Sequence, residues 1–301
     1  MFSETYKAFN LIIRSQNLKL KYIDKVLDQN NYDLLIKEDL NLNLNNHKVD
    51  LKSNDFLITE NGVIVLIKDV GIFRIFDGKL ITWKKENENV TDDDLITFIL
   101  GSIFSICLIQ RGLLVLHANA LEKNGNSVIC LGESGVGKST LAFILMNQGW
   151  NLLADDLVAI NDDNFILPGV SRIKLWENTL KDLAVPTTNL EKVRPNIDKY
   201  VIPKSALRKA QKPVKINAIY IIERNFNCDD YKLKIENVKT QKMGYLLLRE
   251  QIYRPYFMRN LGLEGKYFKK LISFQKFYSV KILKLPNSIL ETVKQLENIA
   301  L

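Results

Sequence analysis

One segment of the sequence has the residue types and the spacing needed to bind phosphates. Residues 132–139 read Gly-Glu-Ser-Gly-Val-Gly-Lys-Ser and match the P-loop pattern G-x-x-x-x-G-K-[ST] at every defined position. The glycines let successive backbone N–H groups point at the phosphates of a nucleotide, and the start of the following helix adds partial positive charge. Lys138 would reach the β- and γ-phosphates, and Ser139 would ligate Mg²⁺. The residues expected to contact the nucleotide are Gly132, Glu133, Ser134, Gly135, Val136, Gly137, Lys138, Ser139 and Thr140.

The residues on either side of this loop favour a nucleotide site over a glycine-rich turn without a ligand. Residues 127–131 form a short apolar run that reads as a strand, and residues 140–145 continue as a helix. Strand, loop and helix in this order are the context that the motif requires. No N-K-x-D-like guanine motif follows the loop, which argues against a GTPase. We therefore expect a nucleotide and Mg²⁺ as ligands.

Two adjacent aspartates, Asp155 and Asp156, follow the strand-like residues 152–154. Neighbouring carboxylates at the end of a buried strand are costly to ionise unless a cation is close, so they indicate a metal ion or a proton-transfer role. One carboxylate would hold magnesium while the other accepts a hydroxyl proton. The alternative is a pair that caps the start of a turn.

His117 stands in an otherwise apolar strand, residues 113–121, just before the strand that leads into the loop. A single histidine on an apolar strand is more often a hydrogen-bonded core residue than a catalytic one. Here the neighbouring strand would deliver phosphates to the same edge of the sheet, so His117 is a candidate catalytic residue.

Together these residues resemble the kinase domain of HPr kinase/phosphorylase and its relatives. The resemblance lies in a strand ending in a histidine, then G-x-S-G-x-G-K-S, a helix and an L-x-A-D-D strand, and it covers about residues 93–225. The branch encoded with lasso-peptide biosynthesis genes looks most similar, through residues 110–118, Pro168-Gly169 and residues 173–176.

The resemblance implies an ATP-dependent kinase that transfers a γ-phosphoryl group to a hydroxyl. Its implied catalytic residues are His117, Lys138, Asp155 and Asp156. Lys138 would neutralise the phosphates, and Asp156 would act as the base toward the hydroxyl. Asp155 would join Ser139 on the metal or its waters, and His117 would orient the phosphoryl group or the second carboxylate.

The acceptor that the resemblance favours is a serine of a ribosomally made precursor peptide. A kinase of a small hydroxyl compound such as free serine is an alternative, and so is a nucleotide-binding switch that transfers nothing. Because HPr kinases are oligomers, a homo-oligomer is a further expectation.

The chain departs from the family pattern after the paired aspartates. The bifunctional enzymes carry a segment like L-E-I-R-G-x-G-I, whereas residues 172–177 here read Arg-Ile-Lys-Leu-Trp-Glu, with Glu177 as the stand-in for a magnesium glutamate. This difference argues against dephosphorylating activity and against HPr as the substrate. A lysine in residues 214–217 would replace a family arginine, and Arg249 and Arg254 are further candidates for a charge-stabilising arginine.

Around these residues the sequence predicts two parts. Residues 1–90 read as a β-rich N-terminal domain, a docking platform or lid, because short β-branched and aromatic runs alternate with Asn-Gly and Asp-Gly turns. Residues 91–301 alternate strands and helices, which predicts an α/β domain with a mixed sheet, an HPr kinase-like P-loop core. Thr91 and Asp94 are spaced like a capping box before an apolar helix of about sixteen residues.

The elements expected in these two parts can be given as residue ranges. The predicted strands are residues 32–37, 55–59, 62–68, 71–75, 113–121, 127–131, 152–160 and 218–222. The later predicted helices are residues 138–148, 262–277 and 287–299, the last with Ser288 as its cap. Tight turns are expected at residues 60–62 and 76–79.

Composition limits the class of protein. The chain has 301 residues, of which 47% are hydrophobic and 25% charged, as in globular proteins. The net charge is +8, but basic and acidic residues are interspersed, so we expect a lysine-rich surface and no nucleic-acid partner. Residues 192–215 are the basic exception, with eight basic residues and one acidic, and would clamp phosphates, attract an acidic peptide or form a solvated loop.

The few histidines and cysteines bear on metal sites and on the compartment. There are two histidines, His47 and His117, and three widely spaced cysteines, which nearly excludes a zinc site and fits a reducing cytoplasm. No secretory signal is visible at the start, and the most apolar segment, residues 95–109, is too short to cross a bilayer, which takes roughly 20 residues. We therefore expect a cytoplasmic protein with no membrane partner.

Overall fold

The structure is a computed structural model that describes residues 2–27, 30–42, 56–59, 62–194, 197–224 and 232–297. Some sequence features lie outside these ranges: His47, Cys228, the start of the strand predicted from Asp55, the turn at Glu60-Asn61 and the end of the last predicted helix. The chain divides into two compact units, Met1–Val115 with Arg254–Gly265 and Leu116–Tyr253 with Lys266–Leu301. Among the described residues, no helix is long and apolar enough to span a bilayer.

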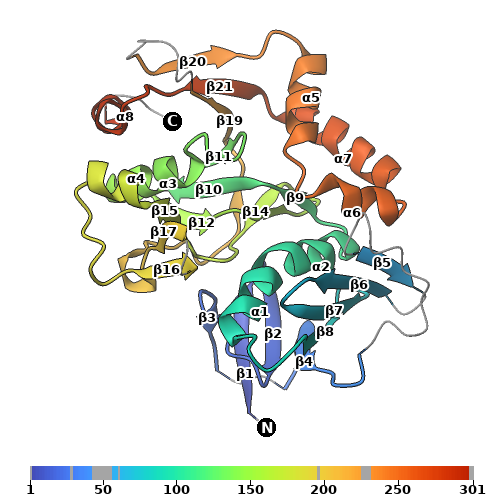
Figure 1. Cartoon of the computed structure of the whole chain (residues 1–301). Coiled ribbons are helices and arrows are strands. Elements are labelled where there is room, and N and C mark those ends of the chain that lie inside the picture. Colours follow the sequence, from blue (N-terminus) through green and yellow to red (C-terminus); the bar gives the residue numbers. More distant parts are fainter. Residues whose placement is uncertain are drawn as a thin grey trace. The chain divides into compact units, whose positions relative to one another are not determined.

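The first unit is built on an eight-stranded sheet in the order β3-β1-β2-β4-β8-β7-β6-β5 (Figure 1). The strands are β1 (Ser3–Ala8), β2 (Leu11–Gln16), β3 (Asp24–Lys25), β4 (Leu34–Glu38), β5 (Phe56–Thr59), β6 (Gly62–Ile67), β7 (Gly71–Phe76) and β8 (Leu80–Lys85). Burial alternates along β2 and β7, so each strand turns one face to the core. The turn predicted at residues 76–79 is confirmed: Asp77 and Gly78 both have positive φ, 50° and 61°, and join β7 to β8.

The predicted apolar helix belongs to this first unit. It runs as α1 (Asp92–Phe98), a π-helical turn (Ile99–Ile103) and α2 (Phe104–Gln110). Its capping box is confirmed, because Thr91 Oγ1 accepts from Asp94 N and Asp94 Oδ2 accepts from Thr91 N. Since α2 packs on β7, the unit extends beyond residue 90, where the sequence predicts a domain boundary. The short α6 (Pro255–Asn260) also lies in this unit.

The second unit has a six-stranded mixed sheet in the order β12-β10-β11-β19-β21-β20. Its strands are β10 (Ala118–Lys123), β11 (Asn126–Leu131), β12 (Asn151–Ala154), β19 (Ala218–Glu223), β20 (Lys234–Asn237) and β21 (Val280–Lys284). The pairs β11–β19 and β19–β21 are parallel, and the others are antiparallel. The predicted α/β class with a mixed sheet, preceded by a β-rich region, is confirmed.

Smaller elements flank this sheet. Two further groups of strands have the orders β18-β14-β13 and β15-β17-β16. Their bounds are β13 (Val158–Ile160), β14 (Phe165–Leu167), β15 (Lys174–Trp176), β16 (Glu191–Arg194), β17 (Ile197–Val201) and β18 (Val214–Lys215). The helices are α3 (Lys138–Asn147), α4 (Glu177–Asp182), a 3₁₀ turn (Lys204–Ala206), α5 (Gln241–Glu250), α7 (Glu264–Phe277) and α8 (Ile289–Leu296). Ser288 caps α8 as predicted, accepting from Glu291 N.

The core of the second unit forms where α3 packs along β10 and β12 (Figure 1). Leu141, Ile144 and Leu145 of α3 are buried in one cluster with Tyr220 of β19 and Leu283 of β21. Because α3 is buried along most of its length, the start of this helix is fixed against the edge of the sheet.

Two strands predicted to be continuous are broken in the structure. Residues 113–121 form β9 (Leu114–Leu116) and β10, separated by His117. Residues 152–160 form β12 and β13, separated at Asp155 and Asp156. Each break has its own physical cause: His117 N donates to the distant Gln251 O instead of a neighbouring strand, and Asp156 has a φ of +73°, which ends a strand. Both breaks place the polar residue at a strand end.

Candidate active site

The phosphate-binding loop has the conformation that its sequence predicts. It connects the end of β11 to the start of α3, and Gly132, Gly135 and Gly137 have φ of +145°, +88° and +106°. These backbone angles are readily reached only without a side chain. At Gly132 a Cβ would lie 2.9 Å from the carbonyl oxygen of Ile222 on β19, so the close approach to the neighbouring strand also requires glycine.

Lys138 is held against this loop. Its Nζ donates to the carbonyl oxygens of Gly132 at 2.6 Å and of Glu133 at 3.0 Å. Burial lowers the pKa of Lys138, while the nearby Asp156 and Asp155 oppose that shift. The ammonium group is thus kept beside the loop N–H groups and the two carboxylates.

Ser139 and Asp155 form the first of two polar pairs. Ser139 Oγ donates to Asp155 Oδ1 at 3.2 Å, which joins the start of α3 to the end of β12. Burial, followed by the charge of Asp156, raises the pKa of Asp155 to about 6. A carboxylate with a raised pKa lacks compensating positive charge, which a divalent cation would supply.

These two side chains suit magnesium. A hydroxyl and a carboxylate oxygen are ligands that Mg²⁺ accepts, and it is usually held by one or two carboxylates together with substrate phosphates. Over the described ranges, no group of three or more His, Cys, Asp or Glu residues could hold a metal ion alone. The residues present therefore fit a metal ion shared with a nucleotide, held by Ser139 and Asp155.

His117 and Asp156 form the second pair. His117 Nδ1 lies 3.2 Å from Asp156 Oδ1, and Lys174 Nζ lies 3.6 Å from Asp156 Oδ2. Burial alone would raise the pKa of Asp156, but the hydrogen bond from His117 and the charge of Lys174 outweigh it and hold the pKa below its usual range. This carboxylate therefore stays ionised at neutral pH, beside a cation and a donor.

Gln251, directly after α5, connects the loop to the histidine. Its backbone oxygen accepts from His117 N at 2.8 Å, and its side-chain Oε1 accepts from Gly132 N at 3.0 Å. The residue is 8% exposed, so both bonds are shielded from water. No sequence pattern marks this glutamine, because its partners lie more than a hundred residues away along the chain.

The structure brings the predicted catalytic residues into one cavity of about 340 Å³, lined by His117, Lys138, Asp155 and Asp156. Of the predicted nucleotide-contacting residues, this cavity is also lined by Ser134, Gly135, Gly137, Ser139 and Thr140. The other three, Gly132, Glu133 and Val136, line a second cavity of about 580 Å³. Arg224 lines both cavities.

Eight residues outside the predicted catalytic and nucleotide-contacting sets also line the first cavity: Asn119, Lys174, Leu175, Trp176, Thr179, Lys199, Arg224 and Ile289. Lys174 and Trp176 alternate along β15, which places both on the same face of that strand. Within the described part of the basic segment 192–215, Lys199 is the member that lines the cavity. Burial and the neighbouring Lys174 lower the pKa of Lys199.

Asn119 is the most unusual of these residues. It is 1% exposed, and neither its side-chain nitrogen nor its side-chain oxygen has a hydrogen-bond partner within the described ranges. Buried amides are nearly always satisfied in folded proteins. Asn119 therefore brings an unsatisfied, buried amide to the wall of this cavity.

Other sequence candidates are not among the residues that line this cavity. Glu177 pairs with Lys181 at 3.7 Å and lines a different cavity, so it does not stand in for a magnesium glutamate. Lys215 is exposed, with its ammonium group over the ring of Phe165. Arg249 is exposed on α5, and Arg254 belongs to the other compact unit.

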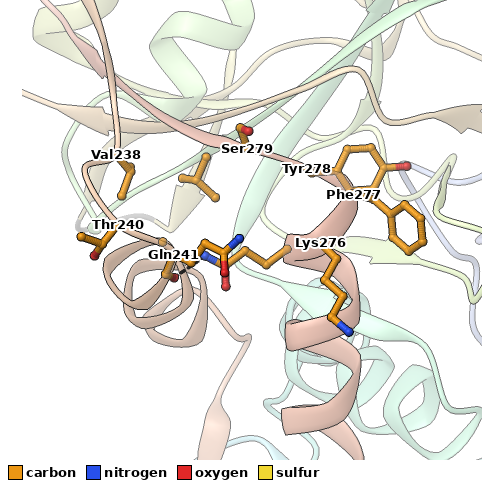
Figure 2. Close-up of a pocket in the computed structure, with 10 residues that line it drawn as sticks. Val238, Thr240, Gln241, Lys276, Phe277, Tyr278 and Ser279 are labelled. Carbon is orange, nitrogen blue, oxygen red and sulfur yellow. Dashed lines mark hydrogen bonds between the residues drawn. The ribbon is translucent and has the colours of Figure 1, made fainter.

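A further cavity of about 190 Å³ lies where the start of α5 meets the end of α7 (Figure 2). Thr240, Gln241 and Gly244 line one side, and residues 275–280 line the other. None of its lining residues is His, Cys, Asp or Glu, so it offers neither a carboxylate base nor a metal ligand.

Comparison with known proteins gives a short sequence match and matches among solved structures. No family model matches the chain. Over 47 residues, 16% of this chain and 15% of the relative, it is 45% identical to the HPr kinase/phosphorylase of Caldanaerobacter subterraneus subsp. tengcongensis. The solved HPr(Ser) kinase/phosphatase of Coxiella burnetii aligns with 61% of this chain and 94% of its own, with 16% identity and a TM-score of 0.27. The short sequence match supports the likeness to HPr kinase/phosphorylase that the motifs indicate, and the likeness to the lasso-peptide branch stays a prediction.

Proposed function

We propose that this chain is an ATP-dependent kinase that transfers the γ-phosphoryl group to a serine hydroxyl of a peptide, a ribosomally made precursor of the lasso type. One observation carries the proposal: the P-loop lysine, the Ser139–Asp155 pair and the His117–Asp156 pair line one cavity. A phosphate-binding loop beside an ionised carboxylate is the arrangement that phosphoryl transfer to a hydroxyl requires.

In this reaction the acceptor oxygen attacks the γ-phosphorus while its proton passes to the carboxylate of Asp156. The bond between the γ-phosphorus and the β–γ bridging oxygen breaks, and ADP leaves with the bonding electrons. Lys138 and the N–H groups of the loop stabilise the charge on the phosphates. Mg²⁺, held by Ser139 and Asp155, supplies further neutralisation of the phosphate oxygens when bound.

The two aspartates divide these roles because their surroundings differ. Asp155 is 4% exposed and accepts a hydrogen bond from Ser139. The side chain of Asp156 is 36% exposed, so an acceptor hydroxyl can reach it, and its lowered pKa means that it carries no proton of its own at neutral pH. Asp156 is therefore the base, and Asp155 is the metal ligand.

Support for a peptide acceptor comes from Trp176. Its side chain lines the catalytic cavity and also an adjoining cavity of about 540 Å³ that includes Asn178 and Ile197. Half of this tryptophan is exposed, and exposed aromatic side chains are frequent anchors for peptide partners. The residues that flank an acceptor serine would have a surface to lie on there.

The matched relative is named an HPr kinase/phosphorylase, which supports phosphoryl transfer as the reaction. This chain matches only about a seventh of that relative's length, so its acceptor and its cytoplasmic location are proposals in their own right. The loss of the L-E-I-R-G-like segment favours an acceptor other than HPr.

The test is transfer from Mg-ATP to three acceptors in parallel: a precursor peptide ending in serine, free serine and HPr. The proposal predicts one added phosphoryl mass on the peptide alone, and none on the same peptide with its serine replaced by alanine. Transfer to free serine alone would replace the proposal with a small-molecule kinase. Binding of ATP without transfer to any acceptor would indicate a nucleotide-binding switch.

A further inference from the structure

Arg224 occupies a position where a nucleotide bound to the P-loop would be within reach. It directly follows β19, which pairs in parallel with β11, the strand that leads into the loop. The carboxyl ends of parallel neighbours meet at the same edge of a sheet, and ligands of α/β proteins bind outside that edge. Arg224 and the P-loop therefore share one edge, although 87 residues separate Arg224 from Gly137 in the sequence.

The guanidinium group lies flat on the loop at Gly137. A Cβ built on Gly137 would be 3.6 Å from Arg224 Cζ, 3.6 Å from Nη2 and 3.7 Å from Nη1. Because these three atoms are nearly equidistant from one point, the plane of the guanidinium faces the loop and its edge points away along the surface. The N–H donors of an arginine lie in that plane, so they are directed past Gly137 and not into it.

The side chain lacks the partner that a semi-buried arginine usually has. Arg224 Nε is buried without a hydrogen-bond partner, and the described residues form no ion pair with this guanidinium. Burial lowers the pKa of Arg224. A guanidinium stays charged in proteins and is seldom left without an acceptor, so the position indicates an anionic ligand.

The other cations of the cavity are already engaged by protein groups. Lys138 donates to loop carbonyls, Lys174 pairs with Asp156, and Lys199 lies over the ring of Trp176 at 5.1 Å. Within the described ranges, no hydrogen bond or ion pair engages the guanidinium of Arg224, and Arg224 lines both the 340 Å³ cavity and the 580 Å³ cavity.

We propose that Arg224 is the phosphate-binding arginine of this protein: its guanidinium edge donates to phosphate oxygens of the nucleotide held by the P-loop. A planar fork of N–H donors matches two phosphate oxygens at once, which an ammonium group does not. The proposal rests on the nucleotide site of the proposed function but needs no acceptor and no transfer step. It replaces Arg249 and Arg254, the arginines that the sequence suggested.

Calorimetric titration with ATP and ADP tests this role in the full-length protein. We expect Arg224→Gln to weaken both affinities by about tenfold to a hundredfold, as the loss of a charge-assisted hydrogen bond does, and Arg224→Lys to recover part of the loss. Arg249→Gln is the matched control, because Arg249 is exposed and lines none of the cavities described above, and it should bind as the unaltered protein does.

Thermal melting separates phosphate binding from a structural role. Without nucleotide, Arg224→Gln should melt at or above the temperature of the unaltered protein, because an unpaired charge leaves a desolvated position. Addition of ATP should then raise its melting temperature less than that of the unaltered protein. Unchanged ATP affinity, or a loss matched by a lower melting temperature without nucleotide, would overturn the proposal.

The outcome is distinguishable from a failure of the proposed function. If ATP binding depends on Arg224 but no acceptor is ever phosphorylated, the kinase proposal fails and the assignment of Arg224 stands. If transfer occurs and Arg224→Gln binds ATP normally, the kinase proposal stands and the assignment of Arg224 fails. Failure of the unaltered protein to bind ATP would overturn both.

Discussion

The imidazole of His117 and Asp156 meet across two strand breaks. His117 Nδ1 lies 3.2 Å from Asp156 Oδ1 and 3.2 Å from the backbone oxygen of the same residue. Because one ring nitrogen faces two acceptors, it must carry a proton. The histidine thereby fixes both the side chain and the main chain of an aspartate whose φ of +73° is unfavourable for a residue with a Cβ.

This relationship predicts that His117 positions the base rather than binding the nucleotide. Replacing it in His117→Ala should lower kcat for phosphoryl transfer by about tenfold to a hundredfold, because the carboxylate loses its orientation. The dissociation constant for ATP should change little, since the contacts of the His117 side chain are with Asp156 and with the ring of Tyr253. Steady-state kinetics and ATP titration of the same preparation measure both. A weakened ATP affinity with unchanged kcat would contradict the assignment.

The unsatisfied amide of Asn119 should lower the stability of the fold while contributing to activity. Its buried amide has no partner in the described structure, which costs about 1–3 kcal/mol of folding free energy. The similarly shaped Asn119→Leu should therefore raise the free energy of unfolding by about 1 kcal/mol or more in urea denaturation, while lowering transfer activity. A variant that is both less stable and fully active would show that the amide has no ligand to serve.

Gln251 predicts coupling between the loop and the fold. In Gln251→Ala the buried N–H of Gly132 loses its acceptor, so the free energy of unfolding should fall by about 1–3 kcal/mol. Urea denaturation of Gln241→Ala, at the exposed start of α5, provides the control and should show a change within about 0.5 kcal/mol. Equal stabilities for the two variants would mean that the bond to Gly132 contributes little.

The raised pKa of Asp155 predicts a pH dependence of stability for the metal-free protein. Asp155 titrates near pH 6 when folded, against 3.8 for the ordinary group, so the folded state binds more protons between these values. Stability must then fall as the pH rises from about 4 to about 6, by on the order of 3 kcal/mol, and stay reduced above that range. The opposite contribution of Asp156, whose pKa is lowered, is present above about pH 4 and is lost only in stronger acid.

Denaturation in the presence of a chelator at several pH values checks this. Asp155→Asn has no carboxylate to protonate, so its stability should be nearly flat across the same window and higher than that of the unaltered protein at pH 7. If the unaltered protein instead gained stability from pH 4 to pH 6, the pKa of Asp155 would not be raised in the folded state.

The loop and its two flanking elements could be predicted because the motif is local. The residues from Ser127 to Met146 contain their own strand, turn and helix signals, and these decide the backbone without help from distant residues. His117, Asp155 and Asp156 were identifiable for a related reason, since a polar residue within an apolar run is conspicuous.

The strand breaks and the cations of the cavity could not be predicted in the same way. Apolar residues continue on both sides of His117 and of Asp155, so the hydrophobic pattern predicts continuous strands. The breaks depend instead on the hydrogen bond from His117 to Gln251 and on the left-handed backbone of Asp156. Lys174 and Arg224 reach the cavity from separate strands with no fixed spacing to the loop. Their convergence is a property of the tertiary structure. From the sequence alone, Arg249 was as good a candidate for a charge-stabilising arginine as Arg224.

The most direct test of the account is the rate of phosphoryl transfer by Asp156→Asn under single-turnover conditions. An asparagine keeps the shape of the side chain but cannot accept the hydroxyl proton, so transfer from Mg-ATP to the acceptor should fall by about 10²–10⁴-fold while the affinity for ATP stays within about threefold. Asp162→Asn, at an exposed aspartate paired with Lys270 away from the cavity, should transfer at the normal rate. An Asp156→Asn protein that transfers at the rate of the unaltered chain would contradict the central claim that this carboxylate is the base of a kinase.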